Sequence, residues 1–140
     1  MKLFVDTWGW LTLRDRREAK HEDVVRLVGE FRAGKGALYT TDYVLDETYT
    51  LLFKRLSFTE AKASVTLLEE AITGNELELV WITPKRFAET QNLRLKLQDK
   101  PNISFTDLTS MIVMGELGIN RILTGDAHFT HVGMGFEITP

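Results

Sequence analysis

The chain has 140 residues, of which 44% are hydrophobic and 26% are charged; its net charge is −3, and it contains no cysteine. A chain of this length buries enough surface to fold as one domain without a disulfide or a structural metal. The lack of cysteine excludes a disulfide framework and a thiolate metal site, and it fits a reducing, cytoplasmic location. No apolar run approaches the ~20 residues of a membrane helix, and residues 1–6 lack the apolar core of a signal peptide. Because the chain is acidic overall, we expect any nucleic-acid site to be local.

Short apolar runs alternate with helical patterns along the chain. The apolar runs predict strands at 2–5, 37–41, 77–82 and 121–124, with a fifth strand at a sheet edge at 135–138. Helical spacing predicts helices at 8–13, 22–33, 42–55, 59–73, 84–98 and 104–117. This alternation predicts an α/β fold: one domain over 1–140, with a central parallel sheet of four to five strands and helices on both faces. Ligands bind such sheets at the carboxyl ends of the strands, where the strand order reverses.

Four acidic residues follow predicted strands or begin the helices beside them. Asp6 follows the first strand, Glu47 lies about a turn into helix 42–55, Asp107 begins helix 104–117, and Asp126 follows the fourth strand. Each has an ordinary explanation taken alone: a helix cap, the capping pattern Ser104-x-x-Asp107, a turn residue or a solvated helix face.

Together, however, these carboxylates would converge on one crevice. Two like charges about 4 Å apart repel by about 4 kcal/mol at an effective dielectric of 20, so a cluster of four needs a counter-ion. Oxygen ligands favour Mg²⁺ or Mn²⁺, and we expect one or two ions. Zinc is not expected, because the chain has no cysteine and only three histidines. The rest of the chain is close to neutral and slightly positive, so a bound cation would remove the main barrier to a phosphate backbone.

The acids lie in four short segments: Val5–Thr7, Thr40–Thr48, Ile103–Asp107 and Leu123–Phe129. In this order, over nearly the whole chain, the segments resemble those of PIN-domain ribonucleases, especially the VapC-like toxins of type II toxin–antitoxin modules. The resemblance implies that three of the acids match the core acidic residues of the family and that the fourth matches a more variable one; the core three are Asp6, Glu47 and Asp107, and the fourth is Asp126. It also implies that three hydroxyls line the site, those of Thr7, Thr106 and Thr124.

Two residues depart from the family pattern. Trp8 stands where a small or aliphatic residue is commoner, and Gly125 gives the backbone before Asp126 more freedom. His128-Phe129 matches the usual ending of the family, and we expect Phe129 in the core. His128 and His131 have the spacing of a metal-binding pair, but we do not expect one, because such pairs need further ligands on ordered elements.

The resemblance implies a metal-dependent endoribonuclease that hydrolyses RNA phosphodiesters, with water as the attacking group. Products with a 5′-phosphate and a 3′-hydroxyl are then expected. Asp6, Asp107 and Asp126 would hold Mg²⁺ or Mn²⁺, and Glu47 would either bind the metal or orient the water.

Basic and aromatic residues suggest where RNA and protein partners bind. Arg14, Arg16 and Arg17, with Lys20, would contact phosphates at the mouth of the crevice; alternatively, they form a solvated charged run. Six large aromatic residues are either core or an apolar surface for a second copy and a small antitoxin protein; they are Trp8, Trp10, Tyr43, Tyr49, Phe53 and Phe58. The resemblance favours a homodimer with an antitoxin partner.

Other functions remain open from the sequence. One is a catalytically inactive PIN-like scaffold that binds RNA or protein, and another is a housekeeping RNA-processing nuclease; metal titration separates the scaffold from a nuclease. A receiver-like domain would need an aspartate after the third strand and a late lysine, but Thr83-Pro84 follows that strand and no lysine follows Lys100. A haloacid-dehalogenase-like phosphatase would need aspartate where Trp8 stands. No glycine-rich phosphate loop is present.

Overall fold

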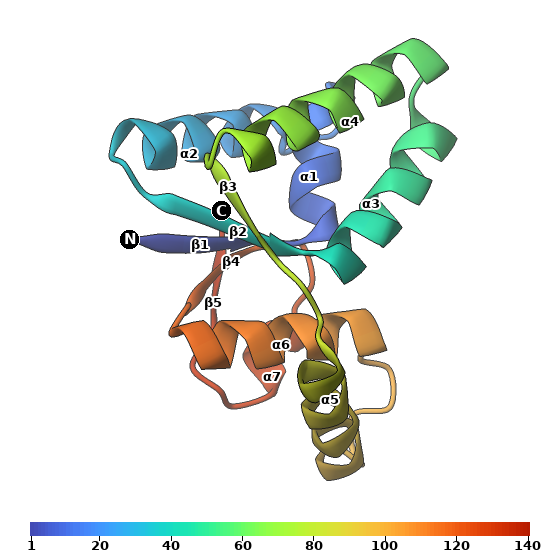
Figure 1. Cartoon of the computed structure of the whole chain (residues 1–140), viewed down its shortest axis with the longest axis vertical. Coiled ribbons are helices and arrows are strands. Elements are labelled where there is room, and N and C mark those ends of the chain that lie inside the picture. The colour runs from blue at the N-terminus through green and yellow to red at the C-terminus, as the bar shows by residue number, and fades with distance from the viewer.

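The computed structural model describes the whole chain, residues 1–140, and confirms the predicted α/β domain (Figure 1). Five strands form one sheet in which every neighbouring pair is parallel: β1 (Lys2–Val5), β2 (Ala37–Thr41), β3 (Leu77–Val80), β4 (Arg121–Leu123) and β5 (Glu137–Thr139). The helices are α1 (Thr7–Arg14), α2 (His21–Ala33), α3 (Asp42–Arg55), α4 (Phe58–Thr73), α5 (Pro84–Lys96), α6 (Phe105–Leu117) and α7 (His128–His131). The short helix α7 was not predicted; β1, β2 and α3 have their predicted bounds, and the ends of the other elements lie within two residues of the predicted ones.

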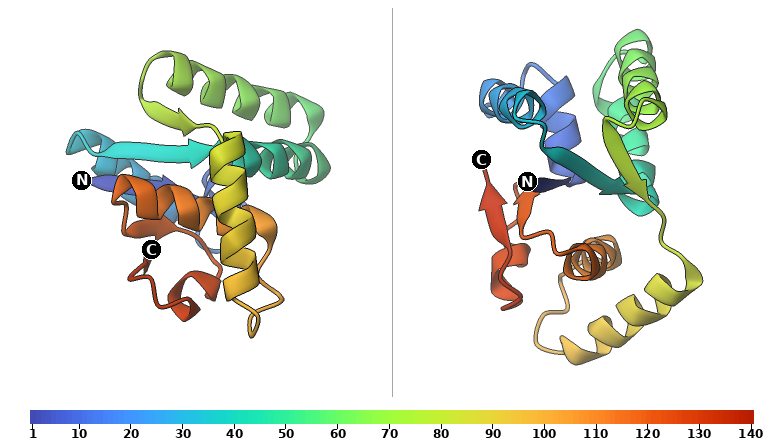
Figure 2. Two further views of the ribbon diagram at one scale, coloured as in Figure 1. Left: turned by 60° about the horizontal axis from the view of Figure 1, so that its bottom comes forward. Right: turned by 60° about the vertical axis from the view of Figure 1, so that its left-hand side comes forward.

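The strand order places the first strand at the centre of the sheet. The order is β3-β2-β1-β4-β5, so the chain builds outward from β1 in one direction and then, with β4 and β5, in the other. Helices α1 to α4 cover one face of the sheet and α5 to α7 cover the other (Figures 1 and 2). The strand order therefore reverses between β1 and β4, which is where parallel α/β sheets bind ligands.

Residues of the central strand are buried on both faces. Leu3, Phe4 and Val5 have no exposed surface, as expected for a parallel strand covered by helices on both sides. Helix α1 approaches this strand closely at Gly9, where a Cβ atom would lie 2.8 Å from Cγ1 of Val5 and 2.9 Å from Cγ of Leu123. Glycine is needed there for close helix packing, and this packing fixes the chain that follows Asp6.

Near the switch point, where the strand order reverses between β1 and β4, hydroxyl side chains cap the first turns of the helices. The Thr41 side chain accepts a hydrogen bond from the backbone N–H of Val44 at the start of α3. The Ser104 side chain accepts one from the N–H of Asp107, which confirms the predicted cap of α6. At its other end, α6 stops at Gly118, whose φ of +67° suits glycine. None of the helices combines the length and the apolar composition that crossing a membrane requires.

Candidate active site

Asp6 lies at the carboxyl end of β1 and is 5% exposed. Its backbone N–H donates to the carbonyl of Leu123 on β4 at 3.1 Å. Although Asp6 occupies the N-cap position of α1, its side chain makes no capping hydrogen bond. Instead its Oδ2 accepts a hydrogen bond of 2.8 Å from the hydroxyl of Thr124. The carboxylate is therefore held at the centre of the sheet edge and does not act as a helix cap.

Thr124 links Asp6 to the loop that carries Asp126. Its hydroxyl donates to Asp6 and also accepts a 3.1 Å hydrogen bond from the backbone N–H of Asp126. The Thr124 side chain is buried, so this connection is shielded from water. The loop then turns at Asp126, whose Oδ1 accepts a 2.9 Å hydrogen bond from the N–H of His128.

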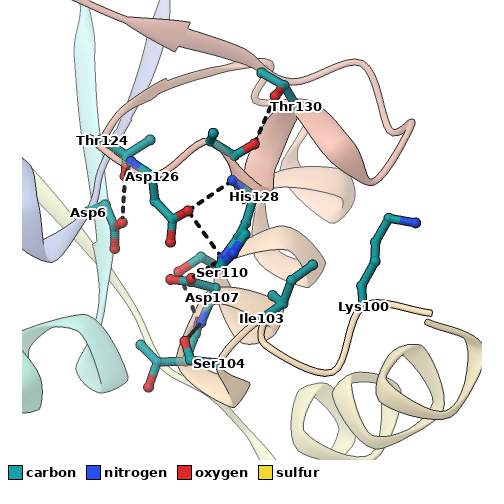
Figure 3. A network of polar contacts seen from close by, with 12 residues as sticks. Asp6, Lys100, Ile103, Ser104, Asp107, Ser110, Thr124, Asp126, His128 and Thr130 are labelled. Atoms are coloured by element: carbon teal, nitrogen blue, oxygen red, sulfur yellow. Dashed lines mark hydrogen bonds and ion pairs between the residues drawn. The ribbon is translucent and has the colours of Figure 1, made fainter. Parts of the chain in front are cut away.

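Asp107, Asp126 and His128 converge beside Asp6. Figure 3 shows their side chains directed toward one another from α6, from the loop after β4 and from α7. The Nδ1 atom of His128 lies 3.1 Å from Oδ1 of Asp126 and 3.9 Å from Oδ2 of Asp107. One potential ligand atom from each of these three residues lies within 4.8 Å of the others, close enough for one cation to bind all three.

The environment of the cluster opposes full ionisation of its acids. Burial raises the pKa of Asp6 to about 6, although the hydrogen bond from Thr124 acts in the opposite direction. Burial also raises the pKa of Asp107 to about 8, and the charge of Asp6 and the contact with Asp126 add to the increase. Because desolvation and like charges both disfavour the carboxylate form, a bound cation would stabilise it.

Glu47 closes the group from the side of α3. It lines an open pocket of about 390 Å³ together with Asp6, Thr124 and Asp126. Its side chain is exposed, and its charge raises the pKa of both Asp6 and Asp107. The structure thus brings the four predicted carboxylates together, from two strand ends and two helices.

The three predicted site-lining threonines occupy different positions. Thr124 orients Asp6 as described. Thr7 lines the same pocket, but its hydroxyl donates to the carbonyl of Val44 at 3.5 Å and so faces α3. The hydroxyl of Thr106 makes no hydrogen bond with the carboxylates; its backbone carbonyl accepts from the hydroxyls of Thr109 and Ser110.

The arginines predicted at the crevice mouth lie in a pocket next to the one that contains the carboxylates. Arg14, Arg16 and Arg17 line an adjoining pocket, here called the arginine pocket. They do not line the pocket that contains Asp6, Glu47 and Asp126, here called the acidic pocket. Arg14 donates to the hydroxyl of Ser64 at 2.8 Å. Arg17 pairs with Asp15 at 3.0 Å, and this guanidinium holds the pKa of Asp15 below its usual value. The direction of the chain after α1, which sequence patterns do not specify, carries these side chains toward α4.

Three residues near the carboxylates were not predicted as part of the site: Leu51, Arg55 and His128. Arg55 is the one basic residue that lines the acidic pocket, and it also lines the arginine pocket. Leu51 and Arg55 follow Glu47 by four and eight residues on α3, a helical spacing that offered a signal for their position along the same side. His128 was expected only as part of a family ending, and its neighbour Phe129 is fully buried as predicted.

The carboxylates cluster at the edge of a parallel sheet, at the point where the strand order reverses. In an α/β domain this is the usual position of a ligand site, and a cluster of carboxylates there suits a divalent cation. The sequence profile of the PIN domain matches residues 3–134. The chain belongs to the PIN-domain family.

Comparison with characterised proteins points to one branch of this family. The chain is 29% identical to the 23S rRNA-specific endonuclease VapC20 of Mycobacterium tuberculosis over 99% of this chain and 98% of VapC20. It is 28% identical to a VapC ribonuclease of Archaeoglobus fulgidus over 93% of this chain and 80% of the relative.

Solved structures agree with these relationships. The crystal structure of VapC20, described as a sarcin–ricin loop cleaving toxin, aligns with a TM-score of 0.77 and 29% identity, covering 94% of this chain and 95% of that one. The VapBC2 complex of Rickettsia felis, bound to a promoter DNA fragment, aligns with a TM-score of 0.71 at 14% identity, covering 99% and 98% of the two chains. At that identity the second match supports the fold alone.

Proposed function

We propose that this protein is a metal-dependent endoribonuclease that hydrolyses RNA phosphodiester bonds, and that it is the toxin of a toxin–antitoxin pair. The observation that carries the proposal is the convergence of Asp6, Glu47, Asp107 and Asp126 at the switch point of a PIN-domain sheet. The relatives named as endonuclease and ribonuclease, which align over most of the chain, support the RNA substrate.

The donor set suits one or two Mg²⁺ or Mn²⁺ ions. Asp6, Asp107 and Asp126 would hold the metal, with Glu47 as a further ligand or as the group that orients water. Carboxylate oxygens are the ligands that these cations prefer, and the raised pKa values of Asp6 and Asp107 indicate a site short of positive charge. When bound, a divalent cation makes water more acidic and neutralises charge on the attacked phosphate.

The protein's own residues position these groups. Thr124 orients Asp6 through its hydrogen bond to Oδ2, and Asp6 lines the acidic pocket. Glu47, on the exposed side, is placed to accept a proton from the attacking water. Arg55 supplies the positive charge that the phosphate needs at the pocket wall. A strand of RNA leaving the acids past Arg55 would then meet Arg14, Arg16 and Arg17 in the adjoining pocket.

A cleavage assay tests this function. The protein is incubated with a pool of single-stranded and hairpin RNAs, including 23S rRNA, with Mg²⁺, with Mn²⁺ or with EDTA. We expect metal-dependent cleavage that EDTA and Asp107→Asn abolish and that Asp46→Asn, an exposed neighbour of Glu47 outside the pocket, leaves intact. Products ending in a 2′,3′-cyclic phosphate would contradict hydrolysis by water. A protein that binds RNA and no metal would support the alternative of an inactive scaffold.

Exposed apolar groups support protein partners. Of the six aromatics considered from the sequence, Trp10 is buried, whereas Phe53 and Phe58 are 44% and 71% exposed, with ring centroids 5.6 Å apart. We assign this pair to contact with a second copy or an antitoxin, both acting with the toxin in the cytoplasm. Molar mass measured by light scattering, alone and after co-expression with the product of a neighbouring small gene, tests this. A monomer that no candidate antitoxin binds would contradict it.

A further inference from the structure

We propose that His128 is itself a ligand of the divalent cation and that its imidazole makes the site prefer Mn²⁺ over Mg²⁺. This inference rests on the proposed metal-dependent function and concerns a residue of the same site. It adds a nitrogen donor to a set otherwise composed of carboxylate oxygens, and so changes which metal the site selects.

The position of the His128 ring carries the first step. Its Nδ1 atom is buried and has no aligned hydrogen-bond partner. It nevertheless lies 3.1 Å from a carboxylate oxygen of Asp126 and 3.9 Å from one of Asp107. The side chain as a whole is 34% exposed, so the ring turns its buried nitrogen toward the acids. Two carboxylates around this nitrogen require a positive charge beside it, either a proton on Nδ1 or, as we propose, a cation that the nitrogen and both carboxylates bind.

The chain holds His128 in this place from both sides. Before it, Oδ1 of Asp126 accepts the backbone N–H of His128. After it, Phe129 is fully buried, with its ring centroid 6.2 Å from that of Phe136. His131, on the same short helix, is exposed and lies outside the group of potential ligands. The structure therefore separates the two histidines: one faces the carboxylates and the other faces water.

The chemistry of the donors gives the metal preference. Mg²⁺ prefers oxygen ligands and binds imidazole weakly, whereas Mn²⁺ accepts both and stands at the start of a series whose later members bind nitrogen still better. Carboxylates alone would bind the two ions with little distinction. A single nitrogen ligand stabilises the Mn²⁺ complex selectively, and removing it should cost about tenfold or more in Mn²⁺ affinity, in the range measured for residues that support a metal site.

A spectroscopic experiment on the whole protein tests the ligand directly. Mn²⁺ is bound at one equivalent, and electron spin echo envelope modulation is used to detect coupling to a ¹⁴N nucleus. We expect the coupling in the native protein and in His131→Gln, and its loss in His128→Gln. Absence of the coupling in the native protein, or its persistence in His128→Gln, would overturn the inference; in the first case His128 would act only by hydrogen bonding to Asp126.

Calorimetric titrations with Mn²⁺ and Mg²⁺ complete the test. His128→Gln should lower Mn²⁺ affinity by about tenfold or more while changing Mg²⁺ affinity by less than about threefold. An equal loss for both ions would contradict the selectivity. Asp107→Asn separates a failure of this inference from a failure of the proposed function. If the native protein binds Mn²⁺ and Asp107→Asn abolishes the binding, the proposed metal site is supported whether or not His128 is a ligand. If the native protein binds neither ion, both proposals fail.

Discussion

The indole ring of Trp8 lies directly against the backbone of Gly125. A Cβ atom at position 125 would lie 2.7 Å from Nε1 of Trp8 and 2.9 Å from two carbons of the same ring. Gly125 does not have a positive φ, so what requires glycine at this position is the close approach of the ring. The two departures from the family pattern explain each other: the glycine makes room for the tryptophan, and both line the acidic pocket.

We expect Gly125→Ala to displace the Trp8 ring and the loop that carries Asp126. Overpacking of this kind costs about 1–3 kcal/mol. In Trp8→Leu the space is open, so adding Gly125→Ala should cost little. Urea unfolding of the two single variants and the double variant measures the coupling energy between the two positions. We expect the double variant to be more stable than the sum of the single effects predicts, by at least about 1 kcal/mol. Strictly additive free energies would show that the ring does not determine the residue at 125.

The metal-free protein should lose stability as the pH rises from about 4 to 8. The pKa of Asp6 is raised from its ordinary value of 3.8 to about 6 in the folded state, so the folded state holds the proton more tightly than the unfolded state does. The two states are equally protonated well below pH 4; above about 6 the native state carries a penalty of about 3 kcal/mol. Asp107, whose pKa is also raised, extends the loss toward pH 8.

Free energies of unfolding in EDTA at several pH values measure this loss. Asp107→Asn should be more stable than the native protein at pH 8, by about 1–2 kcal/mol, and similar to it at pH 4. Saturating Mn²⁺ should restore the stability that the native protein loses at pH 8 and should leave the free energy of unfolding of the variant unchanged. Stability that rises between pH 5 and 8 in EDTA would contradict the assigned direction of both pKa shifts.

Thr124→Val should damage the site by leaving Asp6 without its hydrogen-bond donor. The Thr124 hydroxyl serves both Asp6 and the N–H of Asp126, and a buried polar group that loses its partner costs about 1–3 kcal/mol. The pKa of Asp6 should rise further, because this hydrogen bond lowers it in the native protein. Thr124→Ser retains the hydroxyl and is the matched control. Chemical unfolding and metal titration are the measurements, and equal behaviour of the two variants would contradict the role of the hydroxyl.

The sequence was sufficient for the central part of this site because of a property of parallel sheets. Carboxyl ends of neighbouring strands share one edge, so Asp6 after β1 and Asp126 after β4 were expected to converge, and Val5 is indeed paired with Leu123. The cap at Ser104 fixed Asp107 in the first turn of α6 by local chemistry alone. The position of Asp107 follows from a local capping rule, and the convergence of Asp6 and Asp126 follows from the topology of parallel sheets.

The other parts of the site depend on tertiary contacts, which the pattern of apolar and polar residues along the sequence does not specify. Helix α7 is four residues long, too short to show a helical pattern, so nothing indicated that His128 would face Asp107. The arginines at the end of α1 and just after it were expected at the crevice mouth, but Arg14 instead reaches Ser64 on α4. Arg55 ends α3, eight residues after Glu47; its spacing places it along the same side of the helix, but only the packing of that helix beside the sheet brings this side to the pocket.

Arg55→Gln should weaken RNA binding through the loss of one phosphate contact. Arg55 is the basic residue common to the acidic pocket and the arginine pocket. Affinity at low salt should fall several-fold, and the slope of log K against log salt should decrease by about 0.7–0.9. Arg26→Gln, on the exposed side of α2 where Arg26 pairs with Asp23, is the matched control. Fluorescence anisotropy with a labelled RNA and Asp107→Asn as the background avoids cleavage; equal slopes for the two arginine variants would contradict a direct contact.

Glu47→Gln should abolish most of the activity without affecting the fold. The Glu47 side chain is exposed, so the free energy of unfolding should change by less than about 0.5 kcal/mol, while cleavage should slow by about 100-fold or more as a group that orients water or metal is lost. Its charge raises the pKa of both Asp6 and Asp107, so removing it should move the acid limb of the pH–rate profile toward lower pH. Asp46→Asn, the adjacent exposed acid, removes the same charge outside the pocket and should leave rate and profile unchanged. Single-turnover cleavage across pH 5 to 9 measures both effects, and an equal loss in the two variants would show that Glu47 acts only through the general charge of α3.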